Sequence, residues 1–396
     1  FDLYNQDTSS AICFADRHKL TADHDCVQVM IKIESKTDIS DIRDIVESWG
    51  GDYQCHYGTR VQAMVPISSL ESLTALSNVQ IVRRPYYALP LGGSVDTEAL
   101  GISGATDWHT AGLDGSGVKI AVIDGGFEGY GSLQASGDLP STVTTYDWTG
   151  AGMGGFKHGA ACAEIAYDMA PGATFYLHKI NTEVEFGNAV TQAISDGVDI
   201  ITMSSGWLLG GPGDGTGYLA DIVNTAHANG ILFTVSSGNS AESCWSGTFK
   251  DFGDSSHRFA SGINVNTLGP EPGYVWNIPA GEPILVGMHW DDWAQVNQDY
   301  NLHLLYFNPN NPGAGWQLIT SSTELQNGQS GQTPEEVIEY NAPYDGYYGV
   351  LVDKYSASRN VCFRLIVYGS TGLTFSYQVP QRSLGYPSDC PNTLAA

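Results

Sequence analysis

Hydrophobic and polar positions follow three different patterns along the chain, and each pattern predicts a separate region. In the first, short alternating runs and stretches with helical spacing follow one another after a polar, irregular extension at residues 1–26. Their order of strand, helix, strand, helix and strand predicts a small ferredoxin-like α+β module over residues 27–92. The predicted elements lie at 27–33, 38–51, 60–67, 68–78 and 79–85.

A second pattern begins after a glycine-rich connector, where apolar runs typical of buried strands alternate with longer segments of helical spacing. Strands that alternate with helices form parallel sheets covered on both faces, so this region predicts an α/β domain over residues 93–253. Its first strand, "GVKIAVIDGGF", ends in Asp124 followed by two glycines. The predicted strands end at 124, 180, 205 and 238, and the predicted helices lie at 158–170, 185–197 and 218–230.

The third pattern starts after Phe252, where helical spacing stops and seven short strand-like runs follow, separated by Asn, Gly and Pro. Such runs predict a compact antiparallel β-sandwich over residues 254–384, after which 385–396 return to the α/β domain. Alternation within the strands also predicts the inner face of this sandwich. Its core should contain Trp290, Leu304, Tyr348, Val350 and Phe363.

The net charge of the chain limits the classes of molecule that it is expected to bind. The 396 residues include 43 acidic and 17 basic side chains, for a formal net charge of −26. Nucleic acids and anionic membranes require a positive protein surface, so neither is an expected partner. No apolar run reaches the roughly 18 residues of a membrane-spanning helix. The chain starts at Phe1 rather than Met, which predicts that a leader has been removed. Its charge and its content of Gly, Tyr and Trp favour a secreted, extracellular protein.

Three polar residues are expected to meet where the strands of the parallel sheet end. Asp124 closes one buried strand, His158 opens a helix of small residues 34 positions later, and Asn239 follows another buried strand. The crevice of an open α/β sheet lies beyond the carboxyl ends of its strands. We therefore expect Asp124 and His158 within hydrogen-bond reach and Asn239 facing the same cleft, although Asp-Gly alone is also an ordinary turn. A carboxylate, an imidazole and an amide are the groups that acyl transfer requires beside a nucleophile.

The stretch from Thr97 to about Cys244 resembles the subtilisin-type (S8) serine peptidases. "GLDGSGVKIAVIDGGF" is similar to the family's Asp segment, "HGAACAEI" to its His segment and "SSGNSAE" to its Asn segment. About 32 residues separate Asp and His in that family. The resemblance implies a subtilisin-like parallel sheet with helices on both faces, and peptide-bond hydrolysis. It assigns His158 as base, Asp124 as its orienter, Asn239 as oxyanion donor, and Ser205, Gly206 and Trp207 to the substrate cleft.

The resemblance extends to the flanking regions but lacks one part. Residues 27–92 resemble the family's inhibitory propeptides, and 254–384 resemble a β-domain that some members carry as an insertion. The nucleophile of the family lies in a Gly-Thr-Ser segment that opens a helix, and the sequence contains no such segment. From the family's spacing, we expect it about 50 residues beyond Ala396.

Two functions follow as alternatives. In the favoured one, the chain is most of a secreted serine endopeptidase that acts on polypeptide substrates and receives its serine from another piece, such as a C-terminal fragment. The chain alone should then be inactive, with its junction at Leu91–Thr97 uncut. In the other, it is an inactive relative that serves as an extracellular structural or assembly subunit by self-assembly. The three retained site residues favour the first alternative, and the missing nucleophile favours the second.

The seven cysteines show no CxxC or other metal-ligand spacing, so a zinc site is not expected. For a secreted protein we expect some disulfides, and Cys13 with Cys26 is the nearest pair. An odd number leaves at least one free thiol, and Cys162, in an apolar helix, is the expected one.

No cofactor is required by the implied chemistry, and Ca²⁺ is the one candidate ion. The stretch "HWDDWAQVNQDY" contains Asp291, Asp292 and Asp299, whose hard oxygen ligands could converge on calcium. A solvated acidic loop in a strongly acidic protein is the favoured alternative.

Overall fold

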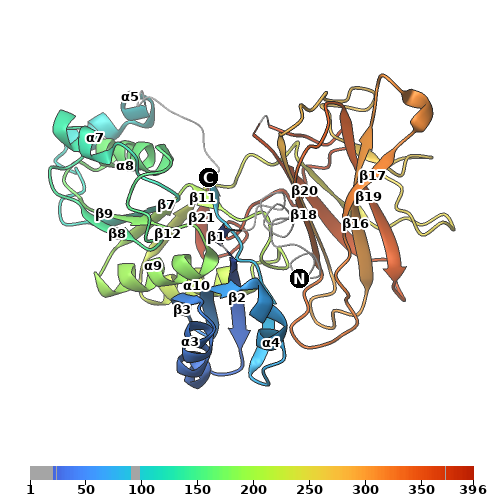
Figure 1. The fold of residues 1–396 in the computed structure, drawn as a ribbon. Helices are drawn as coiled ribbons and strands as arrows, with labels where there is room; N and C mark the ends of the chain where they lie inside the picture. Colours follow the sequence, from blue (N-terminus) through green and yellow to red (C-terminus); the bar gives the residue numbers. More distant parts are fainter. Residues whose placement is uncertain (1–20, 24, 91–98, 371) are drawn as a thin grey trace. The chain divides into compact units, whose positions relative to one another are not determined.

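A computed structural model of the chain describes residues 21–23, 25–90, 99–370 and 372–396 (Figure 1). The predicted Cys13–Cys26 disulfide and the predicted uncut junction at Leu91–Thr97 involve residues outside these ranges. By its internal contacts the chain divides into two compact units. The first holds Phe1–Gln54, Gly58–Arg84 and Asn239–Ser383, and the second holds Cys55–Tyr57, Pro85–Gly238 and Leu384–Ala396.

The second unit is built on a six-stranded parallel sheet with the order β21-β12-β10-β7-β9-β8 (Figure 1). Along β7, Ala121 and Ile123 belong to one buried core, whereas Ile120 and Val122 belong to another. Both faces of this strand are therefore covered, which explains its continuous apolar run and confirms the predicted parallel α/β fold. The strands are β7 (Lys119–Asp124), β8 (Thr144–Asp147), β9 (Thr174–Lys179), β10 (Ile200–Met203), β12 (Leu232–Val235) and β21 (Thr393–Ala395).

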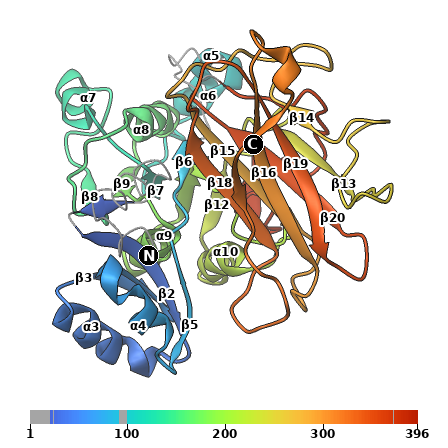
Figure 2. The same cartoon turned by 45° about the vertical axis from the view of Figure 1, so that its right-hand side comes forward.

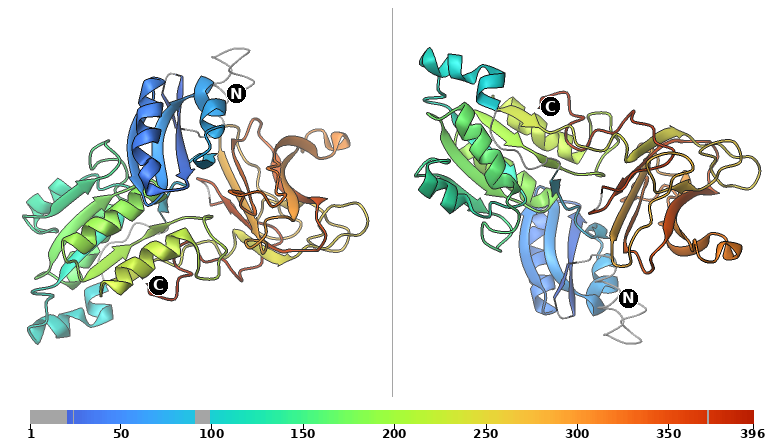
Figure 3. Two further views of the ribbon diagram at one scale, coloured as in Figure 1. Left: turned by 90° about the horizontal axis from the view of Figure 1, so that it is seen from below. Right: turned by 90° about the horizontal axis from the view of Figure 1, so that it is seen from above.

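Helices cover this sheet on both sides. The core on one face includes side chains of α9 and α10, which lie side by side (Figure 3), and the core on the other face includes Ala163 of α8. A capping box between Thr182 and Glu185 fixes where α9 begins. None of the helices in the described part of the chain is long and apolar enough to cross a membrane. The helices are α5 (Ala99–Ser103), α6 (Ala105–Thr110), α7 (Tyr130–Ser136), α8 (His158–Met169), α9 (Glu183–Ser195) and α10 (Tyr218–Ala228).

The first unit contains a small antiparallel sheet with the order β1-β2-β4-β3 and with β5 beside β2. Ile42 and Val46 of α3 and Leu73 of α4 pack with the alternate residues of β2 and β4 in one core. The predicted strand order was incomplete, because β3 has no fully buried residue and so shows no apolar pattern. The elements are β1 (Ala22–Asp23), β2 (Cys26–Ile33), η1 (Lys36–Asp38), α3 (Ile39–Ser48), β3 (Asp52–Tyr57), β4 (Arg60–Pro66), η2 (Ile67–Ser69), α4 (Leu70–Thr74) and β5 (Val79–Arg83).

The rest of the first unit consists of two four-stranded antiparallel sheets, β13-β20-β15-β18 and β14-β19-β16-β17 (Figure 2). One core cluster contains all five residues predicted for it, Trp290, Leu304, Tyr348, Val350 and Phe363. The sheets begin at Cys244, ahead of the predicted boundary at 254, because β13 pairs with β20. The elements are β13 (Cys244–Thr248), β14 (Asn266–Thr267), β15 (Pro283–Trp290), β16 (Asp299–Phe307), η3 (Pro312–Ala314), β17 (Gln317–Ser322), β18 (Glu335–Asn341), β19 (Tyr347–Ser356) and β20 (Cys362–Tyr368).

Trp290→Ala is expected to lower the free energy of unfolding of the first unit by about 3–5 kcal/mol. The Trp290 side chain is fully buried, and its indole N–H donates to the Gln298 carbonyl at 2.9 Å, so truncation leaves both a cavity and an unpaired acceptor. Urea unfolding followed by far-UV circular dichroism measures the loss. Trp316→Ala is the matched control, since that side chain is 37% exposed and should cost less than about 1 kcal/mol. Equal losses in the two variants would contradict the proposed packing.

Candidate active site

Asp124 is the last residue of β7, and only 1% of its surface is exposed. Its Oδ1 accepts a hydrogen bond from the Gly125 N–H at 2.8 Å. The start of α8 approaches this carboxylate so closely that a Cβ atom at position 159 would lie 2.6 Å from the Asp124 Cβ. Gly159 is therefore the residue that lets the helix begin close enough for its first side chain to reach Asp124.

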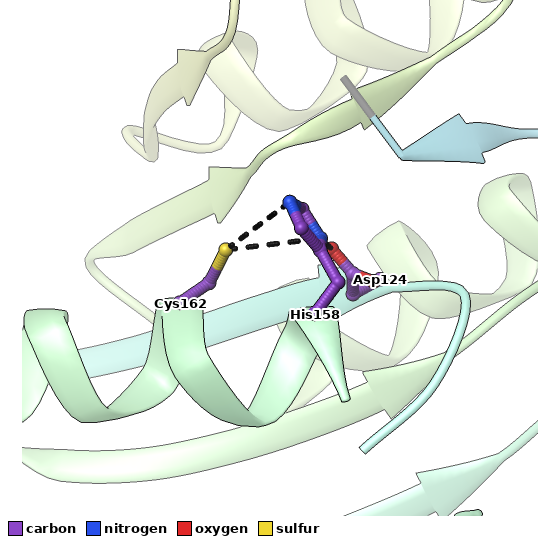
Figure 4. Close-up of side chains that lie close together, drawn as sticks. All are labelled: Asp124, His158 and Cys162. Atoms are coloured by element: carbon purple, nitrogen blue, oxygen red, sulfur yellow. Dashed lines mark hydrogen bonds and ion pairs between the residues drawn. The ribbon is translucent and has the colours of Figure 1, made fainter. Parts of the chain in front are cut away.

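That first side chain is His158. Its Nδ1 lies 2.8 Å from Asp124 Oδ2, and the two side chains are 13% and 1% exposed (Figure 4). When Nδ1 carries a proton and donates a hydrogen bond to the carboxylate, Nε2 is the ring nitrogen that can exchange a proton with another group. The arrangement predicted for Asp124 and His158 is thus the one that the structure contains.

The electrostatics of the pair favour the protonated imidazole. The hydrogen bond to Asp124, followed by that to Cys162, raises the pKa of His158 to about 10, although burial of the ring opposes the shift. At neutral pH the pair therefore rests as an imidazolium beside a carboxylate. The neutral base becomes available as the pH rises toward the alkaline range.

Cys162 is a member of this group that sequence reasoning did not place there. Its Sγ lies 3.9 Å from both ring nitrogens of His158 (Figure 4). Its thiol is free, but so are those of the five other cysteines in the described residues, so the expected disulfides do not form between any two of these six. The spacing of four residues on one helix was the signal that could have revealed the contact. Within the described ranges, Asp124, His158 and Cys162 are the one group of three Asp, Glu, His or Cys side chains close enough together to hold a metal ion.

Cys162→Ala is expected to lower the pKa of His158 from about 10 while leaving it above the ordinary value of 6.5. The substitution removes the smaller of the two hydrogen bonds that raise the pKa and keeps the larger, from Asp124. Imidazole NMR signals followed across a pH titration measure the change. Cys390→Ala serves as control, because that thiol bonds to Ala220 and Asn224 instead. An unchanged midpoint in Cys162→Ala would show that the thiol does not act on the ring.

The residues predicted for the substrate cleft form a short strand and its continuation. β11 (Ser205–Gly206) pairs antiparallel with β6 (Leu89–Pro90), so a segment of the same unit lies along this edge as an added strand. The Trp207 side chain is 1% exposed, with its ring 5.2 Å from that of Phe186. Trp207 can therefore contribute to a cleft only through its backbone, because its side chain belongs to the core.

Two parts of the predicted constellation remain, the oxyanion donor Asn239 and the nucleophile. Asn239 has an exposed side chain and is the first residue of the Asn239–Ser383 part of the first unit, so its approach to a cleft stays a prediction. Among the described residues, the side-chain partners of His158 are Asp124 and Cys162, and no serine hydroxyl is one of them.

The three aspartates proposed for calcium accept hydrogen bonds from other groups of the protein, and Arg359 contacts two of them, Asp291 and Asp292. Asp291 accepts hydrogen bonds from Arg359 and from the Cys362 N–H. Asp292 accepts from the N–H groups of two loop residues, Asn297 at 2.6 Å and Gln298 at 2.9 Å. Asp299 accepts instead from the Gln326 N–H at 3.3 Å. In the described part of the chain these carboxylates do not form a group of three close enough to hold a metal ion, so calcium stays the untested alternative to the favoured acidic loop.

Comparison with known families decides what the Asp124–His158 pair belongs to. Residues 115–267 match the family model Peptidase_S8, which describes the subtilase family. These residues therefore form a subtilase-like segment. The matched range includes Asp124, His158, the β11 edge and Asn239, so every residue predicted for catalysis and substrate binding lies within the subtilase-like segment.

Individual subtilisins are similar to this chain over part of their length. Subtilisin E of Bacillus subtilis (strain 168) is 29% identical over 222 residues, which cover 51% of this chain and 55% of that protein. Subtilisin of Bacillus pumilus is 31% identical over 154 residues, covering 34% of this chain and 52% of that one. The chain thus spans about half the length of the curated relatives that it matches. Among solved structures, the CspB protease of Clostridium perfringens is 11% identical, with a TM-score of 0.41 over 73% of this chain and 70% of that chain.

Proposed function

We propose that the subtilase-like segment supplies the base and the substrate-binding edge of a secreted serine endopeptidase. The observation that carries the proposal is the 2.8 Å contact between buried Asp124 and His158 at the carboxyl edge of the parallel sheet. In acyl transfer, a carboxylate in this position holds the imidazole in the tautomer that can accept a proton at Nε2.

In the proposed mechanism, His158 Nε2 takes the proton of a serine hydroxyl while the serine oxygen attacks the peptide carbonyl carbon. The imidazolium is stabilised by Asp124 and returns the proton to the amine as the C–N bond breaks, leaving an acyl-enzyme for water to hydrolyse. Asn239 is the proposed donor to the carbonyl oxygen while it carries negative charge. An extended polypeptide substrate would pair with Ser205 and Gly206, the edge that Leu89–Pro90 pairs with in this structure.

The serine is proposed to come from a polypeptide segment other than Phe1–Ala396. This follows from the missing Gly-Thr-Ser segment and from the set of His158 partners, which includes no serine hydroxyl among the described residues. The regions 27–92 and 254–384 are proposed to act as a propeptide-like module and as an inserted β-sandwich. The formal net charge of −26 is compatible with an extracellular protein that binds neither nucleic acid nor anionic membranes.

The test is to label protein purified from its natural source with a fluorophosphonate, which reacts with activated serines, and to map the modified peptide. We expect a single labelled serine outside the sequence Phe1–Ala396, in a fragment or extension that copurifies with it. Loss of the label in His158→Ala, together with an unchanged circular dichroism spectrum, would tie the reactivity to the base. Labelling of a serine within the chain would overturn the assignment of the nucleophile. Absence of any label would favour the inactive structural subunit instead.

A further inference from the structure

A cavity of about 410 Å³ lies on the first unit. Its walls come from two neighbouring strands, β16 and β19, and from the segment that follows β17. The flanking residues Tyr300, Leu302 and Val352 belong to the core of the two sheets, so the cavity opens on the face of β16 and β19 that points away from that core. It is lined by Asp299, Asn301, Thr323, Leu325 and Tyr355.

The walls combine exposed apolar surface with fixed polar groups. Tyr355 and Leu325 are 68% and 52% exposed, which leaves an aromatic ring and an aliphatic side chain facing solvent. Asp299 and Asn301 are buried by comparison, with only 2% and 9% of their surface exposed. Pockets that bind small molecules show this combination of apolar walls and a few placed polar groups, and a volume of 410 Å³ is within their usual range.

Hydrogen bonds hold the polar wall in place. Asn301 Nδ2 donates to Asp353 Oδ2 at 3.2 Å, and the other oxygen of Asp353 bonds to His303. His303 Nδ1 in turn lies 2.7 Å from the Ser321 hydroxyl, so three adjacent strands are linked by one chain of side chains. The remaining donors and acceptors on the wall therefore have fixed positions, which lowers the entropy lost when a ligand binds.

We propose that this cavity binds a neutral, hydroxyl-rich ligand, namely a sugar unit of a glycan. The apolar face of a pyranose ring would stack on Tyr355, while its hydroxyl groups would donate to the carboxylate of Asp299 and to the amide oxygen of Asn301. Acidic side chains on the wall and beside it disfavour anionic ligands, as does the formal net charge of −26. The proposal does not depend on peptidase activity, because none of its residues takes part in the proposed catalysis. It gives the unit a role in attaching the protein to glycan surfaces.

Isothermal titration of the whole chain with cellohexaose, xylohexaose and mannohexaose tests the proposal, with polygalacturonate as the anionic comparison. We expect at least one neutral hexasaccharide to bind, and Tyr355→Ala to weaken that binding about tenfold or more, equivalent to at least 1.4 kcal/mol. Tyr355→Phe keeps the ring and should bind nearly as the unmodified chain does. Asp299→Asn should weaken binding as well, because an acceptor oxygen becomes an amide nitrogen donor.

Tyr274→Ala is the matched control, since Tyr274 is 65% exposed on the same unit but does not line the cavity. Its binding should equal that of the unmodified chain. The proposal is overturned if no neutral hexasaccharide binds, if Tyr355→Ala and Tyr274→Ala bind alike, or if polygalacturonate binds more tightly than every neutral sugar. Circular dichroism of each variant separates a lost contact from a lost fold.

Discussion

Residues 1–396 produced by themselves are expected to release no peptides from casein above background and to take no fluorophosphonate label. The base and its orienting carboxylate are present, but a proton acceptor without an attacking hydroxyl cannot form the acyl-enzyme. In a subtilisin-type site, loss of the serine lowers kcat by about 10⁶-fold. A fluorogenic peptide assay with a detection limit below that residual rate measures the effect.

The control for this experiment is the same chain with His158→Ala. If the unmodified chain is inactive, the two proteins should give the same background signal. Cleavage that is present in the unmodified chain and lost in His158→Ala would show that a serine within these residues acts as the nucleophile. That outcome would remove the need for a second polypeptide and would redirect the search to the serines of the chain itself.

Asp124→Asn, made in the serine-complete protein, is expected to lower kcat about 10⁴-fold. An amide at this position holds His158 in the wrong tautomer and does not stabilise the imidazolium. Because the bond to Asp124 is the largest cause of the raised His158 pKa of about 10, the residual activity should also reach its plateau at a lower pH. Rate measurements between pH 5 and pH 11 record both effects. Asp138→Asn, which replaces an exposed carboxylate of the same unit, should change neither.

The same pair predicts a pH effect on stability that needs no serine. The folded-state pKa of His158, about 10, lies above its unfolded value of 6.5, so folding is favoured by binding a proton. The stabilisation of the unmodified chain relative to Asp124→Asn should be complete below about pH 6.5. It should then decline as the pH rises through about 10. A difference that increases with pH would contradict the ion pair.

The sequence predicted the centre of the site because the signals there are strong. A strand with four consecutive apolar residues, Ile120 to Ile123, ends in the carboxylate of Asp124, and a helix starts with His158 followed by small residues. These two patterns predict that both side chains lie at the same edge of the sheet. Asp124 and His158 are also brought together by backbone geometry, through the close approach that Gly159 allows. The core of the two antiparallel sheets followed from alternation for the same reason, since the inward residues of β15, β16 and β20 are apolar.

Other features depend on tertiary contacts that no local pattern encodes. β3 and β8 are short strands without fully buried residues, so neither shows a regular pattern of apolar residues in the sequence. Trp207 was assigned to a cleft by its motif, whereas the packing of Phe186 against it places its side chain in the core. The cavity beside Tyr355 requires the register of β16 against β19, in which Asn301 lies opposite Asp353. Residues 299 and 353 are far apart in the sequence. Only the register of β16 against β19 brings the stretches around them together to form one wall of the cavity.

The pairing of Leu89–Pro90 with Ser205–Gly206 also determines how a substrate can reach the edge strand. A segment joined covalently to its own binding site competes at an effective concentration that does not change on dilution, and short flexible connections give values in the millimolar range. Peptides at micromolar concentration would therefore seldom displace it, whatever their sequence, unless they pair with more of the strand than two residues. A cut beside β6 would leave the segment joined to the chain on one side only, and the segment would dilute into solvent once the fragment that carries it dissociates. Access to the edge would then be controlled by the continuity of the polypeptide, and a single cut would change it more than any modest gain in substrate affinity.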